Sequence, residues 1–511
     1  MHFSDAIQQL LDLRVFLISF LICLCVYEFY DWWNVKMSSL MNLPPGPWGL
    51  PGVGCIPYLF LASYRTGLPL SEPHLLLTHL TESYGKVYSM YVGSKLLVFL
   101  NSYSSIRDAF QNRFISDRPY SNIVEKLGGK GEGINLSSGS PWIEQRRFTL
   151  RAFSRFGLGK RRFEDQVLME AGVLVSECFK YGGKAFNPDI LFPKATSNVL
   201  CSVIFGKRFD YDEPKFERLL HISKRQIEII GTGVVALYVP LVKYFQGDIT
   251  QELVAITTEQ REELNKFITE HKENFDPDNL DSYLDVYLSE IEKSKENGTE
   301  SEVNEDNLIC TIREIFGAGT ESSASTMGWL MLHMMEYPEV QTRVHQELDA
   351  VVGRNRMPRM SDKPDLVYTH ATILEVQRIQ SIGPLGFPHL SSQKTSIGDF
   401  EIPAGTIVVP NVWAIDHDPD VWPDPWRFDP NRFISEDGGI FREEEVIPFS
   451  LGRRVCLGEN LAKMELFLFF SHLLHQFTIK KVDKMTKLDF KGVVGSTYSP
   501  RPFEMIADKR E

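Results

Sequence analysis

The spacing of apolar residues changes along the chain, and it predicts helices over most of its length. From residue 141 to about 350 the pattern is mostly helical. Residues 86–100 are instead rich in β-branched and aromatic residues around a Gly-Ser pair, which predicts a β-hairpin. Residues 396–410 are strand-like again, and residues 411–455 are rich in loops. The pattern therefore predicts a mainly α fold with a smaller β region.

The N-terminal residues 1–41 form a separate apolar segment. Val15 to Tyr27 is uncharged, and Trp32 and Trp33 follow it. This run is shorter than the roughly 20 residues of a membrane span, but leucines before it and aromatic residues after it extend it. A cleaved signal peptide is the alternative. Because an aromatic belt follows and no small-residue cleavage site does, we expect a retained membrane-anchor helix.

Residues 42–54 separate this anchor from the remainder of the chain. They are rich in proline and glycine, so they cannot continue a helix, and the prolines stiffen them. We predict a hinge here, followed by one large body over residues 55–511.

The longest helical pattern covers about residues 304–336. Gly317 and Gly319 interrupt its middle, where each glycine costs about 1 kcal/mol relative to alanine. Small residues at such a place leave room for a flat group or for local opening of the helix, and Glu321 and Ser322 offer an acid and a hydroxyl beside it. The alternative is a point at which two helices cross closely.

A single cysteine precedes the last long helical pattern, in the stretch PFSLGRRVCLGENLAKMELFLFF (448–470). Apolar residues recur at helical spacing after Gly458, so Cys456 is expected just before a helix N-terminus. Free N–H groups and the positive end of the helix dipole stabilise a thiolate there, and Arg453 and Arg454 add positive charge. A buried structural cysteine is the alternative.

Three charged residues predict a buried ion-pair cluster. Glu375 and Arg378 are three residues apart, so they face the same side of a helix. Their apolar neighbours indicate burial, where an ion pair is costly to break and fixes geometry. Arg432 in WRFDPNRF (426–433) is a candidate third member.

Composition narrows the function classes further. The chain has 511 residues and a net charge of −13, which argues against general affinity for nucleic acid. Between Arg146 and Arg162 it carries seven basic residues and no acid, which favours docking of an acidic partner, although a solvated helix face is the alternative. Seven scattered cysteines without a CxxC motif suit a reducing compartment and argue against a disulfide framework or a structural zinc site.

Five motifs in this order resemble the cytochrome P450 haem-thiolate monooxygenases, and within them the microsomal family-two group. They are the anchor with its PPGP hinge, WIEQR (142–146), AGTES (318–322), EVQR (375–378) followed by FDPNRF (428–433), and FSLGRRVCLG (449–458). The resemblance covers nearly the whole chain and implies the cytochrome P450 fold, with residues 55–511 as its catalytic domain.

The resemblance also implies which residues hold haem b. Cys456 would be the axial ligand of the haem iron, since thiolate donation favours O–O cleavage. Gly452 and Phe449 would lie beside it. The remaining haem contacts implied are Trp142, Arg146, Arg454, His389 and Arg118. Glu375, Arg378 and Arg432 would brace the cysteine loop.

On the other face of the haem, the resemblance implies an oxygen-activating groove at Ala318, Gly319, Glu321 and Ser322. There the acid and the hydroxyl would relay protons. The family usually has threonine where this chain has Ser322. The hydroxyl remains, but the methyl group that fixes its rotamer is absent, so we expect looser coupling of electrons to product.

The resemblance finally implies partners and a location. Electrons from NADPH would arrive through NADPH–cytochrome P450 reductase, with cytochrome b5 as a second donor, docked on Arg147, Arg151 and Arg155. The substrate would be a lipophilic small molecule: a steroid, fatty acid, terpenoid or xenobiotic. The apolar residues 231–245 would touch the endoplasmic reticulum membrane, with the catalytic domain facing the cytosol. The candidate pocket walls, each of which fits the core equally well, are Phe316, Ile382, Leu385 and Phe387.

Two other functions are compatible with a haem-thiolate chain. A peroxide isomerase or dehydratase needs no reductase, but such relatives typically disrupt the acid–alcohol pair that Glu321 and Ser322 retain. A non-enzymatic haem or lipid carrier needs neither this pair nor a basic face. The sequence therefore favours a monooxygenase.

Overall fold

The computed structural model describes residues 42–120, 131–156, 161–238, 247–483 and 485–511. The predicted anchor over residues 1–41 lies outside these ranges. Within them, no helix combines the length and the apolar character that a membrane crossing needs.

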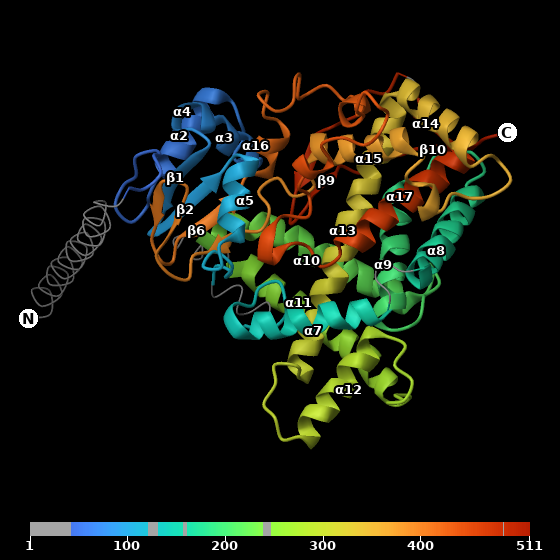
Figure 1. Ribbon diagram of the computed structural model, residues 1–511, viewed down its shortest axis with the longest axis horizontal. Helices are drawn as coiled ribbons and strands as arrows, with labels where there is room; N and C mark the ends of the chain where they lie inside the picture. The colour runs from blue at the N-terminus through green and yellow to red at the C-terminus, as the bar shows by residue number, and fades with distance from the viewer. Residues whose placement is uncertain (1–41, 121–130, 157–160, 239–246, 484) are drawn as a thin grey trace, which may run out of the picture.

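A small lobe near the start of the described chain is built on a four-stranded sheet (Figure 1). The strand order is β1–β2–β6–β3, in which only β2 and β6 run parallel. The predicted hairpin is β1–β2, and it turns at Gly93, whose φ of 60° suits glycine. The strands of this sheet and the helices around it are β1 (Val87–Val92), β2 (Lys95–Leu100), β3 (His389–Leu390), β6 (Ile407–Pro410), α2 (Ile56–Thr66), α3 (Pro73–His79), α4 (Thr81–Tyr84), α5 (Tyr103–Gln111) and α16 (Val412–Asp416).

The larger lobe is helical, which confirms the mainly α fold with a smaller β region. One long helix, α13, runs through its middle, and α12 projects from its far edge (Figure 1). The long helices are α7 (Gly139–Phe156), α8 (Arg161–Lys180), α9 (Phe192–Ile204), α10 (Pro214–Tyr238), α11 (Gly247–Lys272), α12 (Tyr283–Glu296), α13 (Glu305–Glu336), α14 (Pro338–Val351), α15 (Val367–Gln380) and α17 (Glu459–Gln476).

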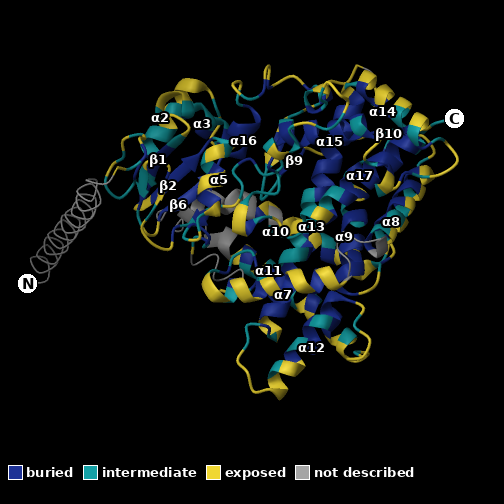
Figure 2. Cartoon of the chain, viewed as in Figure 1, coloured by how far each residue is buried: buried dark blue, intermediate teal, exposed yellow. Residues whose placement is uncertain are grey.

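Local sequence explains both ends of α13. The side chain of Asn304 caps its start by accepting a hydrogen bond from the Asn307 N–H at 3.0 Å. The helix ends at Glu336, two residues before Pro338, which cannot continue it. The helix predicted over 304–336 is therefore confirmed to within one residue, and Figure 2 shows that most of it is buried.

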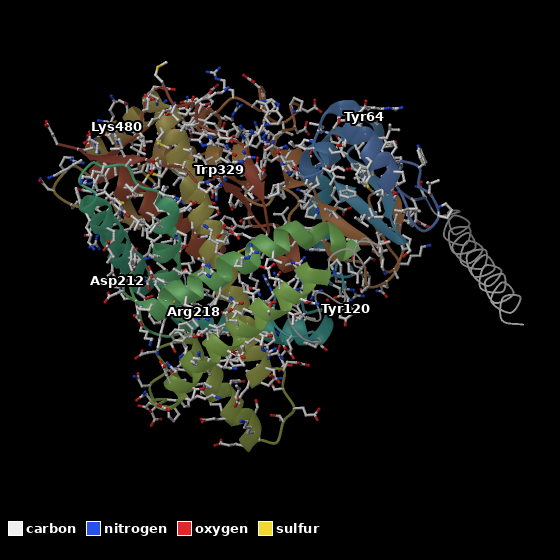
Figure 3. The ribbon with its side chains drawn as sticks, turned by 180° about the vertical axis from the view of Figure 1, so that it is seen from behind. Tyr64, Tyr120, Asp212, Arg218, Trp329 and Lys480 are labelled. Atoms are coloured by element: carbon white, nitrogen blue, oxygen red, sulfur yellow. The ribbon has the colours of Figure 1, made fainter. Side chains whose placement is uncertain are left out.

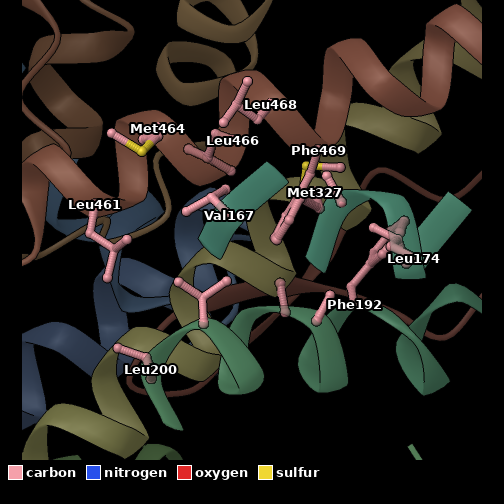
Figure 4. Packing of buried hydrophobic residues seen from close by; sticks show 14 of the residues in the cluster. Val167, Leu174, Phe192, Leu200, Met327, Leu461, Met464, Leu466, Leu468 and Phe469 are labelled. Atoms are coloured by element: carbon pink, nitrogen blue, oxygen red, sulfur yellow. The ribbon is translucent and has the colours of Figure 1, made fainter. Parts of the chain in front are cut away.

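The main core lies where α8, α9, α13 and α17 meet (Figure 4). Figure 4 shows Met327 of α13 beside Phe469 of α17, and the same cluster includes Val167 and Leu174 of α8 and Leu200 of α9. All five are buried, and each fully buried side chain of this kind stabilises the fold by roughly 1.5–3 kcal/mol. This packing fixes α13 against α17, the helix that follows the cysteine loop.

The proline- and glycine-rich residues 42–54 contain no helix, as predicted. They lie along β1, where the Ser89 N–H donates to the Pro45 carbonyl and the Ser89 hydroxyl donates to the Pro44 carbonyl, both at 2.7 Å. A Cβ on Gly46 would lie 1.6 Å from the Ser89 carbonyl oxygen, so the contact needs glycine. From Pro44 onward the segment is thus bound to the sheet, and its role as a hinge stays a prediction.

The remaining strands form three short hairpins or pairs. One of them, the β8–β9 hairpin, packs against α13: the Trp329 indole N–H donates to the Tyr498 carbonyl at 2.9 Å, and the two rings stack with centroids 5.7 Å apart. Trp329 is buried, and Figure 3 labels it near the middle of the view. The pairs are β4 (Thr395–Ile397) with β5 (Phe400–Ile402), β7 (Phe477–Lys480) with β10 (Ile506–Lys509), and β8 (Gly492–Val494) with β9 (Tyr498–Pro500).

Candidate active site

The loop that carries Cys456 is fixed by backbone contacts. The Cys456 N–H donates to the Phe449 carbonyl at 2.9 Å, which closes the loop just before α17. Gly452 has a φ of 73°, and a Cβ there would lie 2.1 Å from the Phe110 carbonyl oxygen at the end of α5. Glycine is therefore needed at position 452 because the loop packs closely against α5. Among the five described cysteines, Cys456 is the only exposed one.

The surroundings of the Cys456 sulfur have opposing effects on its ionisation. Burial raises the pKa of the Cys456 thiol even though part of the residue is exposed. The N–H groups of Gly458 and Glu459 and the charge of Arg146 lower this pKa but do not outweigh burial. The arginine that acts on the sulfur comes from α7 rather than from the adjacent Arg453–Arg454 pair.

The side chain of Arg454 is held by main-chain oxygens. Its guanidinium donates to the carbonyls of Ser116, Ile134 and Ser137 at 2.7, 3.0 and 2.6 Å. Burial, followed by the nearby charge of Arg118, lowers the pKa of Arg454 to about 8. The shift marks a buried place where positive charges lie close together.

Arg118 and His389 lie close to Arg454. Arg118 donates to the carbonyls of Asn135 and Pro388 at 3.1 and 2.9 Å. His389 is buried, and its ring stacks on Phe110 with centroids 3.8 Å apart. Burial, Arg118 and Arg454 together hold the pKa of His389 well below its usual value, so its imidazole is neutral.

Trp142 supplies the observation that tests whether haem fits here. Its indole N–H is buried, and none of the described residues accepts a hydrogen bond from it. The Arg454 guanidinium lies 3.7 Å from the centre of its ring, and one turn further along α7 the Arg146 guanidinium donates to the Val455 carbonyl at 2.5 Å. An unused donor, a cluster of arginines and an exposed cysteine fit a haem whose two propionates are anionic.

The middle of α13 is more accessible than the remainder of the helix. Ala318 is exposed, while residues 323–335 are all buried. The two glycines differ: a Cβ on Gly319 would lie 2.7 Å from Leu200 of α9, whereas nothing lies within 4 Å of a Cβ on Gly317. Close helix packing therefore accounts for Gly319, and open space lies beside Gly317.

The acid and the alcohol of this segment have separate partners. The Ser322 hydroxyl donates to the Ala318 carbonyl of its own helix at 2.8 Å. The Glu321 carboxyl instead contacts the hydroxyls of Ser325 and Ser499 at 3.2 and 3.1 Å. Within the described part of the chain, no hydrogen bond joins the acid to the alcohol.

The predicted ion-pair cluster comes together in the core. Arg378 and Glu375 form two hydrogen bonds of 2.7 and 2.9 Å, and both side chains are fully buried. Arg432 donates to the same carboxylate at 3.0 Å and to the carbonyls of Pro423 and Asp424 at 2.7 Å. The cluster thereby ties α15 to the loop that precedes the cysteine.

The remaining predicted residues are divided between surface and core. Arg147, Arg151 and Arg155 are exposed and lie one turn apart on α7. Of the candidate pocket walls, Phe387 is exposed, whereas Ile382 and Leu385 are half-buried. Phe316 is fully buried and packs in the main core, and its role as a pocket wall stays a prediction.

Sequence reasoning missed an acid that organises the site. Glu314 of α13 accepts hydrogen bonds from the N–H groups of Ile134 and Asn135 at 2.6 and 2.8 Å. The carbonyls of these two residues accept from Arg454 and Arg118, so this loop is held between α13 and the cationic cluster. Burial raises the pKa of Glu314. An acid within an apolar helical pattern, seven residues before Glu321, was the available signal.

Comparisons with known proteins agree with this geometry. The cytochrome P450 family model matches residues 44–506. The chain is 36% identical to cytochrome P450 2U1 of Bos taurus, covering 92% of this chain and 90% of that protein. It is 35% identical to cytochrome P450 2J5 of Mus musculus, covering 92% of each. It is 34% identical to cytochrome P450 18a1 of Drosophila melanogaster, covering 99% of this chain and 94% of that protein. The chain belongs to the cytochrome P450 family of haem monooxygenases, as its motifs predicted.

Proposed function

We propose that this enzyme inserts one oxygen atom of O2 into a lipophilic small molecule, with electrons from NADPH delivered by a flavoprotein reductase. The observation that carries the proposal is the two-sided character of α7. Trp142 and Arg146 on its inner side contact the cysteine loop and its arginines, while Arg147, Arg151 and Arg155 point to solvent. One helix thereby connects the cysteine with a basic surface.

The residues of the chain would divide the work between two faces of the bound group. Haem b, when bound through Cys456, would supply the redox chemistry of O–O cleavage. Its propionates would be bound by Trp142, Arg146, Arg118 and Arg454. The neutral imidazole of His389 would donate or accept a hydrogen bond without adding charge. On α13, Glu321 would provide protons, and the Ser322 hydroxyl would pass them on after it leaves the Ala318 carbonyl.

The basic surface favours an acidic redox partner. The guanidinium groups of Arg147, Arg151 and Arg155 form no ion pair with any described acid, so their charges remain available to a partner. Charge complementarity of this kind speeds association and weakens with ionic strength. NADPH–cytochrome P450 reductase fits this role, and cytochrome b5 is a second partner of the same character.

An apolar surface beside the N-terminal segment favours contact with a membrane. Helix α2 has no buried residue. Tyr64 at its end is 87% exposed and lies at the outer edge of the small lobe (Figure 3). Further exposed apolar residues nearby are Trp48, Leu50, Phe60, Leu61 and Leu70. Such a patch suits a lipid surface, in agreement with an endoplasmic reticulum location and a substrate that enters from the bilayer. The side chains of residues 231–245, the other predicted membrane contact, lie outside the described part.

A charge-reversal experiment tests the proposal. We expect Arg147→Glu combined with Arg151→Glu to slow NADPH-driven reduction of the haem by the reductase about tenfold or more at low salt, with the difference shrinking at high salt. Reduction by dithionite should be unaffected. The matched control is Arg107→Glu, which changes a base on α5 in the small lobe. Equal reduction rates in the double variant and the control would contradict the docking proposal.

A further inference from the structure

Glu321 belongs to a cluster of hydroxyl groups contributed by two distant segments. Ser325 lies one turn further along α13, and Ser499 and Thr497 come from the β8–β9 hairpin. The Ser325 and Ser499 oxygens are 2.8 Å apart, and the Ser499 and Thr497 oxygens are 3.1 Å apart. With the two contacts to Glu321, at 3.2 and 3.1 Å, the cluster has four contacts.

Each of these four contacts needs one hydrogen between its two oxygens if all four are hydrogen bonds. The hydroxyls of Thr497, Ser499 and Ser325 supply three of these hydrogens. A proton on Glu321 supplies the fourth. Thr497 then donates to Ser499, Ser499 to Ser325, Ser325 to Glu321, and Glu321 back to Ser499. Ser499 donates once and accepts twice, which is the full capacity of a hydroxyl.

A charged Glu321 cannot complete the cluster. Only three hydrogens would then be available for the four contacts. If both serines donate to the carboxylate, the contact of 2.8 Å between their oxygens contains no hydrogen. Two oxygens without a hydrogen between them repel each other. The observed arrangement therefore corresponds to the neutral carboxyl group.

We propose that Glu321 is stored in this enzyme as a proton-bearing carboxyl, and that Ser499 of the β8–β9 hairpin is the residue that positions it. Once the proton has been delivered toward Ser322, the cluster provides the route for its replacement. Solvent gives a proton to half-buried Thr497, Thr497 gives one to Ser499, and Ser499 gives one to Glu321. Each hydroxyl ends with the hydrogen count with which it began, and one proton has moved from solvent to the carboxylate.

The surroundings of Glu321 agree with a neutral group. Burial raises the pKa of Glu321, and this effect outweighs the hydrogen bonds that Ser499 and Ser325 would donate to its charged form, which lower the pKa. Two charged groups on other elements act on it in opposite directions. Lys224 of α10 lowers the pKa of Glu321, and Asp189, just before α9, raises it.

Infrared spectroscopy of the full-length holoenzyme tests the storage of the proton. We expect a protonated-carboxyl band at neutral pH that is absent in Glu321→Gln. Ser499→Ala should shift or remove this band, while Ser499→Thr, which keeps the hydroxyl, should restore it. Ser496→Ala is the matched control, because its side chain lies in the same turn and makes no hydrogen bond to a described residue. A wild-type carboxylate at pH 7, or a band that Ser499→Ala leaves unchanged, would overturn the inference.

A kinetic measurement separates this inference from the proposed relay role of Glu321, on which it rests. With reductase and NADPH, failed proton delivery releases hydrogen peroxide. We expect Ser499→Ala to raise the peroxide released per NADPH consumed by about fivefold, and Ser499→Thr to return it to the wild-type value. If Glu321→Gln itself leaves this ratio unchanged, the relay role fails. If Glu321→Gln raises it and Ser499→Ala does not, only the role of Ser499 fails.

Discussion

The cysteine loop and the middle of α13 satisfy their polar side chains in different ways. Around the loop, the arginines donate to main-chain carbonyls: Arg454 to three of them, Arg146 to one and Arg118 to others. In the middle of α13, Glu321 contacts hydroxyl side chains that come from two segments. Bonds to the main chain fix positions, whereas hydroxyl groups can exchange partners without unfolding anything. The first region is therefore suited to holding a bound group in place, and the second to the proton transfer that we propose.

The largest effect should come from breaking the ion-pair cluster behind the loop. Glu375→Ala leaves Arg378 buried and unpaired, which we expect to lower the free energy of unfolding by about 3–5 kcal/mol. Urea unfolding of the wild type and the variant measures this. The control is Glu270→Ala, which breaks the exposed pair between Lys215 and Glu270 and should change stability far less. Similar losses of unfolding free energy in both variants would contradict a larger stabilising contribution from the buried cluster.

The next effect concerns the contact of the loop with α5. Gly452→Ala places a Cβ against the Phe110 carbonyl and strains a positive φ, so we expect a loss of about 3 kcal/mol together with poor haem retention. Gly353→Ala is a matched control, because Gly353 has nearly the same φ of 72° and open space around its Cβ position. It should lose only about 1 kcal/mol. A Gly452→Ala variant as stable as the control would refute the packing role.

A buried acid connects the two regions and gives a pH test. Glu465 of α17 accepts a hydrogen bond from Ser323 of α13 at 2.7 Å, and burial raises the pKa of Glu465 to about 8. The folded state therefore binds this proton more tightly than the unfolded state, and stability falls as the pH rises from about 4.5 toward 8. The slope should reach at most about 1.4 kcal/mol per pH unit. Urea unfolding at pH 6 and pH 8 should show Glu465→Gln losing this dependence; an unchanged slope would assign it to other groups.

The smallest effect distinguishes the two glycines of α13. Gly319→Ala meets Leu200, whereas Gly317→Ala meets open space and gains helix propensity. We expect Gly317→Ala to be the more stable variant by about 1 kcal/mol. Thermal unfolding of both variants measures the difference. The reverse order would place the close helix crossing at Gly317.

The two regions also differ in how much of them could be predicted from the sequence. The helix over 304–336 and the start of α17 follow from local spacing, as does the pair of Glu375 with Arg378 three residues away. These interactions join neighbours in the chain, so a periodic pattern contains them.

The contacts that could not be predicted join residues far apart in the chain. Ser499 is 178 residues from Glu321, and Asn135 is 179 residues from Glu314. Only the tertiary fold decides which hydroxyl or N–H group meets a given carboxyl group. The same reason explains why Arg146, rather than Arg453, acts on the Cys456 sulfur.

The central claim is that Cys456 holds haem iron as a thiolate. The most direct measurement is the carbon monoxide difference spectrum of the dithionite-reduced enzyme, recorded beside a Cys456→Ala variant. We predict a strongly red-shifted Soret band in the wild type and its loss in the variant, with the fold retained by circular dichroism. A histidine-type band in the wild type, or a red-shifted band that persists in Cys456→Ala, would contradict the assignment.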